Sequence, residues 1–93
     1  MPETPSDQLL LYSYVEDVLE RRGPHREAHL AHLQAERDAG RLLIAGAYGD
    51  PVRGAAIGFH EVTRDQVERF VAEDPYQRAG LIVSHEIHPW KLV

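Results

Sequence analysis

Apolar residues in this chain gather in four short runs, separated by segments of a different pattern. In the run over residues 8–15, Leu9 and Leu11 alternate with Leu10 and Tyr12, so both faces of the extended chain are apolar. A strand that is apolar on both faces belongs to a sheet that is covered on both sides. The predicted strands are residues 8–15, 41–47, 55–62 and 81–93, and Pro89 confines the later part of the last strand to a sheet edge or a bend.

Two of the intervening segments have the pattern of helices. Residues 24–39 begin with a proline that suits a first helical turn, contain mostly strong helix formers, and precede Gly40, a good terminator. In residues 63–73, Thr63 and Gln66 form a capping-box pattern before an apolar stripe. Residues 74–80 predict a short helical turn. Residues 16–23 are charged and fit either a strand extension or a loop.

The resulting order, β-α-β-β-α-β, predicts an α+β ferredoxin-like fold, with two helices on one face of a four-stranded antiparallel sheet. Two helices cover only that one face, while the pattern makes the other face apolar as well. A second copy of the sheet is the simplest cover for it. We therefore predict a homodimer with its sheets face to face, and leave open whether dimers assemble further.

Composition and charge narrow the classes of function. The 93 residues predict a single domain over residues 8–93 behind a flexible leader over residues 1–7. The chain has no cysteine, which excludes disulfides and thiolate chemistry, and its net charge of -5 argues against binding of nucleic acid. No apolar run approaches the roughly 20 residues of a membrane span, and no signal peptide is recognisable, so we expect a cytoplasmic protein without a membrane partner.

His29 and Asp74 are the candidates for acid–base chemistry. An imidazole titrates near neutral pH, and a neighbouring carboxylate can orient it as a base. Each residue also has a structural interpretation: His29 lies beside the leucines of an amphipathic helix, and Asp74 precedes Pro75 in the pattern of an acid that caps a short helix. Nothing in their spacing shows that they touch.

A stripe of histidines on the first long helix raises the question of a metal site. His25, His29 and His32 lie at i, i+4 and i+7, and an i, i+4 pair binds zinc in some enzymes. Without a cysteine, or a glutamate in the metalloprotease arrangement, a solvated stripe is the better interpretation. We predict no metal site.

The last strand carries a second set of candidates. Glu86, His88 and Trp90 alternate onto one face, where they would line a pocket if that face lay inside a dimer. The alternative is that Glu86 and His88 are solvated edge-strand residues that discourage aggregation. Tyr76 and the tyrosines of the first strand fit packing and substrate contact equally well.

Two blocks of sequence resemble the YciI-like (YCII-related) family. The first is Arg26-Glu27-Ala28-His29-Leu30 followed by Gly40-Arg41-Leu42-Leu43-x-x-Gly46, and the second is Asp74-Pro75-Tyr76 followed by Ala79-Gly80. The chain departs from the family pattern at Glu27 and Ala47, where the family often has proline. The resemblance implies a dimeric α+β barrel with an active site built on His29 and Asp74, and with Arg26 placed to contact an anionic substrate.

Three functions follow as hypotheses. The first is a cofactor-free lyase or isomerase, of which a dehydrochlorinase in the family is an example, acting on a small aromatic or enol-like molecule. His29 would carry the proton, and Arg26 and Tyr76 would contact the substrate. The second is a non-catalytic module that binds a small ligand or serves a pathway enzyme. The third, by analogy of fold alone, is a cofactor-free monooxygenase.

Overall fold

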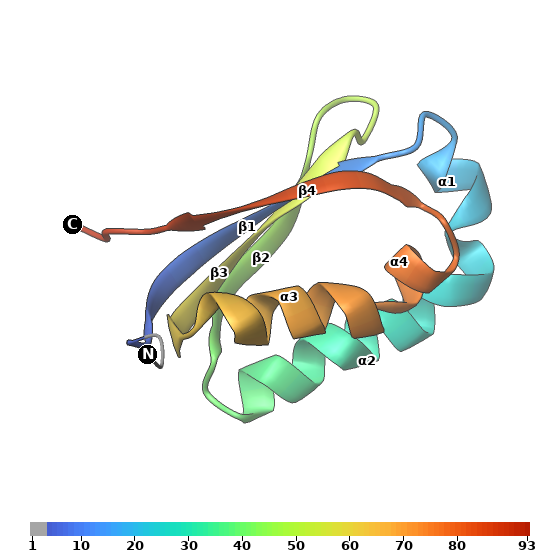
Figure 1. The fold of residues 1–93 in the computed structure, drawn as a ribbon. Helices are drawn as coiled ribbons and strands as arrows, with labels where there is room; N and C mark the ends of the chain where they lie inside the picture. Colours follow the sequence, from blue (N-terminus) through green and yellow to red (C-terminus); the bar gives the residue numbers. More distant parts are fainter. Residues whose placement is uncertain (1–3) are drawn as a thin grey trace.

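The computed structural model describes residues 4–93, which form one antiparallel sheet with helices on one of its faces (Figure 1). The strands are β1 (Ser6–Tyr14), β2 (Leu42–Tyr48), β3 (Gly54–Val62) and β4 (Ile82–Pro89). They are hydrogen-bonded in the order β2-β3-β1-β4, so β1 and β3 are central and β2 and β4 are edges. This arrangement confirms the predicted ferredoxin-like α+β fold.

Four helices connect the strands. They are α1 (Val18–Arg21), α2 (Gly23–Asp38), α3 (Arg64–Glu73) and α4 (Pro75–Arg78). The two long ones, α2 and α3, lie on the same face of the sheet (Figure 1). Their predicted ends are confirmed: Pro24 lies in the first turn of α2, Gly40 follows it with a φ of 77°, and Thr63 and Gln66 form the capping box of α3.

Three boundaries differ from the sequence prediction. Residues 16–23 neither extend β1 nor form a loop; they contain α1, which buries Val18 in the core. The last strand ends at Pro89 instead of residue 93. Of the expected leader over residues 1–7, positions 1–3 lie outside the described residues. Its last two residues, Ser6 and Asp7, already belong to β1. The carboxylate of Asp7 accepts a hydrogen bond from His60 Nδ1 at 2.9 Å.

The core lies between the sheet and the helices. Leu10 and Tyr12 on β1, and Ile57 and Phe59 on β3, are buried on this side, and Phe70 of α3 packs edge-on against Phe59. The alternation of strand side chains explains the choice of face, because residues two apart point the same way. Leu9 and Leu11 therefore point to the other side of the sheet, where they are only partly buried.

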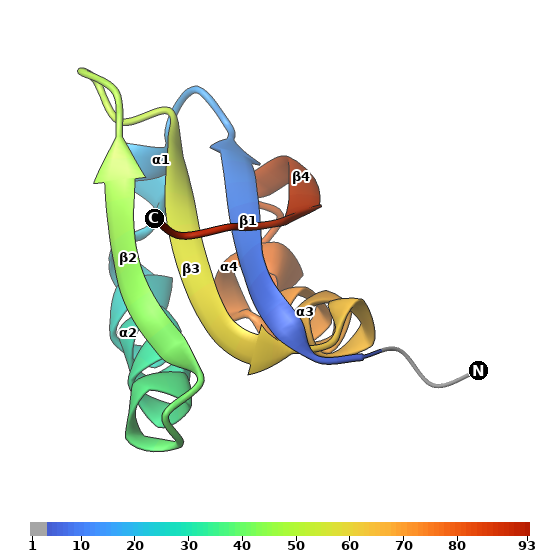
Figure 2. The same cartoon turned by 90° about the vertical axis from the view of Figure 1, so that its left-hand side faces the viewer.

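The face opposite the helices is largely uncovered. The C-terminal residues cross in front of β1 on this face (Figure 2), and Trp90 lies there against Gly58 of β3. A Cβ at position 58 would collide with the Trp90 ring, so the close approach requires glycine. Nearby, Ile44 of β2 is 62% exposed. Among the described residues, no helix is long and apolar enough to cross a membrane.

Candidate active site

The fold brings His29 and Asp74 into direct contact. His29 lies on the side of α2 that faces the sheet, and Asp74 lies at the break between α3 and α4. Their side-chain atoms Nδ1 and Oδ1 are 2.7 Å apart, and the two residues are 5% and 0% exposed. Two residues that are 45 positions apart in sequence thus form a buried histidine–carboxylate pair.

Asp74 holds this position through two further hydrogen bonds. Its Oδ1 also accepts from the backbone N–H of Tyr76 at 2.9 Å, which caps the N-terminus of α4, and its Oδ2 accepts from the hydroxyl of Tyr12 at 2.8 Å. The capping role and the pairing role predicted as alternatives for Asp74 are therefore both present. Pro75 supports the geometry because it begins α4 without needing a hydrogen-bond acceptor.

This environment specifies the tautomer of His29. An ionised carboxylate only accepts hydrogen bonds, so the Nδ1 atom facing Asp74 must carry a hydrogen. In the neutral imidazole, the lone pair then lies on Nε2. Nε2 makes no hydrogen bond with residues 4–93, and His29 is one of the residues that line a cavity.

Tyr76 fixes the plane of the His29 ring. The two rings are stacked, with centroids 3.7 Å apart and an interplanar angle of 7°, and Tyr14 packs edge-on against Tyr76 at 5.9 Å. Tyr76 is buried, yet its hydroxyl has no hydrogen-bond partner within the described chain. A buried hydroxyl without a partner is costly, and Tyr76 is also one of the residues that line the adjacent cavity.

The tyrosines around Asp74 are held in their neutral form. Burial raises the pKa of Tyr12 far above its ordinary value of 10.0, and the negative charge of Asp74 and the hydrogen bond to it act in the same direction. Burial, followed by the charge of Asp74, also raises the pKa of Tyr14. The phenol of Tyr12 therefore remains a hydrogen-bond donor to the carboxylate.

A cavity of about 440 Å³ lies beside this group, between α2 and the strands β2 and β3. Its walls include the rings of His29 and Tyr76 and the side chain of Arg26, as the sequence predicts for a substrate site. Small residues shape its floor, because Ala45 and Ala47 of β2 pair with Ile57 and Ala55 of β3. Cavities of this size hold small organic molecules.

The predicted contacts on β4 lie elsewhere. Glu86 and His88 are exposed and interact with each other, with Nε2 and Oε1 3.2 Å apart, and neither residue lines the cavity beside His29. Trp90 lines a separate apolar hollow of about 480 Å³ on the uncovered face of the sheet. Within one chain the structure does not bring these residues to His29. A pocket between two sheets that would include them stays a prediction.

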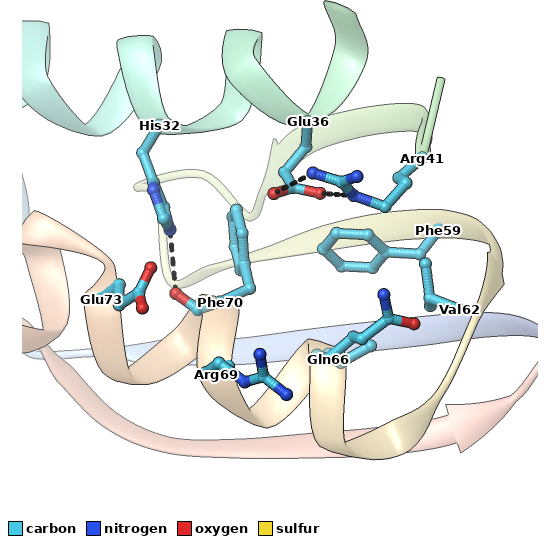
Figure 3. Close-up of a pocket in the computed structure, with 10 residues that line it drawn as sticks. His32, Glu36, Arg41, Phe59, Val62, Gln66, Arg69, Phe70 and Glu73 are labelled. Carbon is cyan, nitrogen blue, oxygen red and sulfur yellow. Dashed lines mark hydrogen bonds and ion pairs between the residues drawn. The ribbon is translucent and has the colours of Figure 1, made fainter. Parts of the chain in front are cut away.

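The histidine stripe divides between two sites. His32 points toward α3 and lines a second cavity of about 310 Å³ between α2 and α3, which His29 does not line (Figure 3). Its Nε2 donates to the backbone oxygen of Phe70 at 2.9 Å, and the two rings are stacked at 4.2 Å. Among residues 4–93 no group of three or more histidine, cysteine, aspartate or glutamate side chains is arranged to hold a metal ion.

The sequence interpretation left Tyr12 open between packing and substrate contact, and it did not foresee the hydrogen bond from Tyr12 to Asp74. The available signal is that Tyr12 occupies the same face of β1 as Leu10, which is the face that packs against the helices. A buried tyrosine needs a partner for its hydroxyl, and a nearby buried acid is a natural one. Arg22 was missed as a lining residue of the cavity, whereas Tyr14, left open between packing and substrate contact, does line it.

Comparison with known proteins identifies the family. The model of the YCII-related domain matches residues 8–91. The protein YciI of Escherichia coli O6:H1 and that of Shigella flexneri are each 34% identical over 86 residues, covering 83% of this chain and 88% of theirs. A solved structure with TM-score 0.78 and 24% identity, covering 91% of this chain and 93% of its own, is the 5-chloro-2-hydroxyhydroquinone dehydrochlorinase of Burkholderia phenoliruptrix with 2,5-dihydroxybenzoquinone. This chain belongs to the YCII-related domain family.

Proposed function

We propose that this protein is a small-molecule enzyme in which His29 moves a proton to and from a ligand in the adjacent cavity. The observation that carries the proposal is the 2.7 Å contact between His29 Nδ1 and Asp74, which leaves Nε2 free for the ligand. Asp74 would orient the ring and stabilise its charged form after proton uptake. A base that is held in this way is the minimal requirement for a lyase or isomerase.

The proposed substrate is an aromatic or enol-like molecule. The dehydrochlorinase with the same fold acts on a chlorinated hydroxyhydroquinone, as its name states. In an elimination of that type the base takes a proton, the electrons of the broken C–H or O–H bond enter the ring system, and chloride leaves with the electrons of the C–Cl bond. Arg26 would stabilise the oxyanion, and the unpartnered hydroxyl of Tyr76 would donate to it. This chemistry needs no cofactor.

The protein would act as a homodimer. The face opposite the helices carries Ile44, which is 62% exposed, and the partly buried Leu9 and Leu11, together with the apolar hollow beside Trp90. A contiguous apolar surface of this kind is characteristic of an interface. A second copy of the sheet would cover it and enclose Glu86 and His88 between the two sheets.

The test is chloride release from 5-chloro-2-hydroxyhydroquinone, together with deuterium uptake by enolisable ketones, measured for the native protein and for His29→Gln. We expect His29→Gln to lower the rate by about 100-fold or more, the usual contribution of a general base. His25→Gln, on the same helix but outside the cavity, is the matched control and should keep the native rate. Equal rates for the native protein and His29→Gln would refute the role of His29.

A binding module predicts a different result. In that case a ligand would raise the melting temperature of the native protein. Neither chloride release nor deuterium uptake would exceed the rate without protein.

A further inference from the structure

The cavity beside His29 has a positively charged wall in a negatively charged protein. Arg22, Arg26 and Arg37 line it, whereas no aspartate or glutamate does, although the chain as a whole has a net charge of -5. Asp74 lies behind His29 and is 0% exposed. The local charge therefore has the opposite sign to that of the whole chain, which favours the entry of anions.

These arginines are not neutralised by other side chains. Within residues 4–93, none of the three forms an ion pair, and Arg37 donates only to the neutral side chain of Gln34, at 3.1 Å. Three other arginines, Arg21, Arg41 and Arg64, do have carboxylate partners, the shortest contact being that of Arg41 with Glu36 at 2.7 Å. The guanidinium groups at the cavity are thus available to a ligand.

Two of the arginines act at one end of the cavity. Arg22 and Arg26 lie one helical turn apart at the start of α2 and line the cavity together with Tyr14, and their positive charges lower the pKa of Tyr14 against the larger effect of its burial. The Tyr14 hydroxyl makes no hydrogen bond within the described residues. Arg37 is eleven residues beyond Arg26 on α2, about 16 Å along the helix axis, so it cannot hold the same ligand group.

The rest of the cavity near α2 is apolar. Leu30 and Leu33 lie on the helix between the two charged ends, opposite the alanine floor. The apolar part of a ligand would pack here beside His29. A charged group at one end of the same ligand would contact the guanidinium groups of Arg22 and Arg26 and the phenol of Tyr14. The planar guanidinium group of arginine donates two parallel hydrogen bonds to the oxygens of a carboxylate or phosphate. Such charge-assisted hydrogen bonds are stronger than hydrogen bonds between neutral groups.

We propose that the cavity is selective for a small organic anion, whose carboxylate or phosphate group is held by Arg22 and Arg26 with the Tyr14 hydroxyl. The inference deepens the proposed function. It rests on that function in one respect, because the reacting part of the ligand is placed beside His29. It adds Arg22 and Tyr14 to the binding residues, and it predicts that a ligand binds more weakly when its anionic group is replaced by a neutral one.

The experiment is a titration of the full-length protein followed by amide resonances in NMR, with benzoate, 2-hydroxybenzoate and phenyl phosphate at concentrations up to about 10 mM. Benzamide and 2-hydroxybenzamide are the neutral counterparts. We expect the acids to bind at least about tenfold more tightly than the amides, with the largest shifts around residues 14, 22, 26 and 29. The relative affinities of benzoate and phenyl phosphate distinguish the two kinds of anionic group.

Variants separate the local charges from the net charge. Arg22→Gln and Arg26→Gln should each weaken binding of the acids by about tenfold and leave the amides unchanged. Arg69→Gln, on α3 and outside this cavity, removes the same charge and should have no effect. Equal binding of acids and amides, no binding of any acid, or an equal effect of Arg22→Gln and Arg69→Gln would overturn the inference.

The outcome is independent of proton transfer. His29→Gln should retain the preference for acids even though it removes the proposed base. If that variant keeps both the preference and the native rate of turnover, the proposed function fails while the anion site stands. If turnover needs His29 but acids and amides bind alike, the anion site alone fails.

Discussion

Replacement of Asp74 tests how firmly one carboxylate holds the site and the fold together. Asp74→Ala removes three buried hydrogen bonds, from His29, Tyr12 and the amide of Tyr76. A hydrogen bond to a charged group contributes about 1.5–3 kcal/mol, and the three contributions overlap because they share one side chain. We expect a loss of about 4–6 kcal/mol in the free energy of unfolding.

That loss is large relative to the stability of such a domain. At about 0.05–0.15 kcal/mol per residue, a chain of 93 residues has about 5–14 kcal/mol in total. Asp74→Ala should therefore lie close to its unfolding midpoint at room temperature if the native stability is at the lower end of this range, and should stay folded with a reduced midpoint if it is at the upper end. Asp74→Asn keeps an oxygen for His29 and the Tyr76 amide, but it loses the charge and turns the acceptor of the Tyr12 hydroxyl into an NH2 donor, so its expected loss is about 1–3 kcal/mol.

Asp74→Ser separates the two roles of the residue. A serine hydroxyl can still cap α4 by accepting from the Tyr76 amide, but its side chain is too short to reach His29. This variant should retain α4, while nitrogen chemical shifts of the His29 ring should no longer report hydrogen on Nδ1 alone. The native protein and Asp50→Asn, an exposed acid in the turn after β2, should both keep the Nδ1–H tautomer.

The assay is urea unfolding followed by circular dichroism at a fixed protein concentration, because association would add to the apparent stability. Asp50→Asn should change the free energy by less than about 0.5 kcal/mol. A loss below about 1 kcal/mol in Asp74→Ala would refute the reasoning, because it would mean that the three hydrogen bonds contribute little to folding.

Three other perturbations test the packing and the dimer. Gly54→Ala should lower stability by about 2–3 kcal/mol in thermal unfolding, because its Cβ would meet the backbone oxygen of Tyr12, whereas Gly46→Ala, whose Cβ enters open space, should not. Because the raised pKa values of Tyr12 and Tyr14 favour the neutral phenols in the folded state, stability should be complete below pH 10 and fall above it, by up to about 1.4 kcal/mol per pH unit for each group. Tyr12→Phe should reduce that slope in urea unfolding at pH 9 and 11, and an unchanged slope would contradict the burial of its phenol. Ile44→Lys should convert a dimer to a monomer in analytical ultracentrifugation, and a native protein that is already monomeric would refute the proposed interface.

The order of strands and long helices could be predicted from the sequence because each has a strong local signal. A short run that is apolar on both faces marks β1, and the capping box of Thr63 and Gln66 marks the start of α3. The short helix α1 could not be predicted in the same way, since its four residues are too few for a period and Val18 is its only buried residue.

The candidate site was predictable only in part. His29 and Asp74 each have a sequence context, but their contact depends on α4 packing beside α2, which no local pattern encodes. The stripe of histidines suggested a single environment, yet the helix turns His32 toward Phe70 of α3. Residues that share one stripe of a helix can thus contact different neighbours when two elements pack against that helix from different sides.

The alanine floor of the cavity implies that ligand size and acid–base chemistry can evolve separately in this protein. The proposed chemistry depends on side chains of α2 and α4, whereas the depth of the cavity depends on the small residues Ala45, Ala47 and Ala55 of β2 and β3. A larger side chain at position 47 would fill space without touching the hydrogen bonds of Asp74. Descendants of one ancestral chain could therefore accept ligands of different dimensions through single substitutions in β2, while inheriting the same proton-transfer machinery.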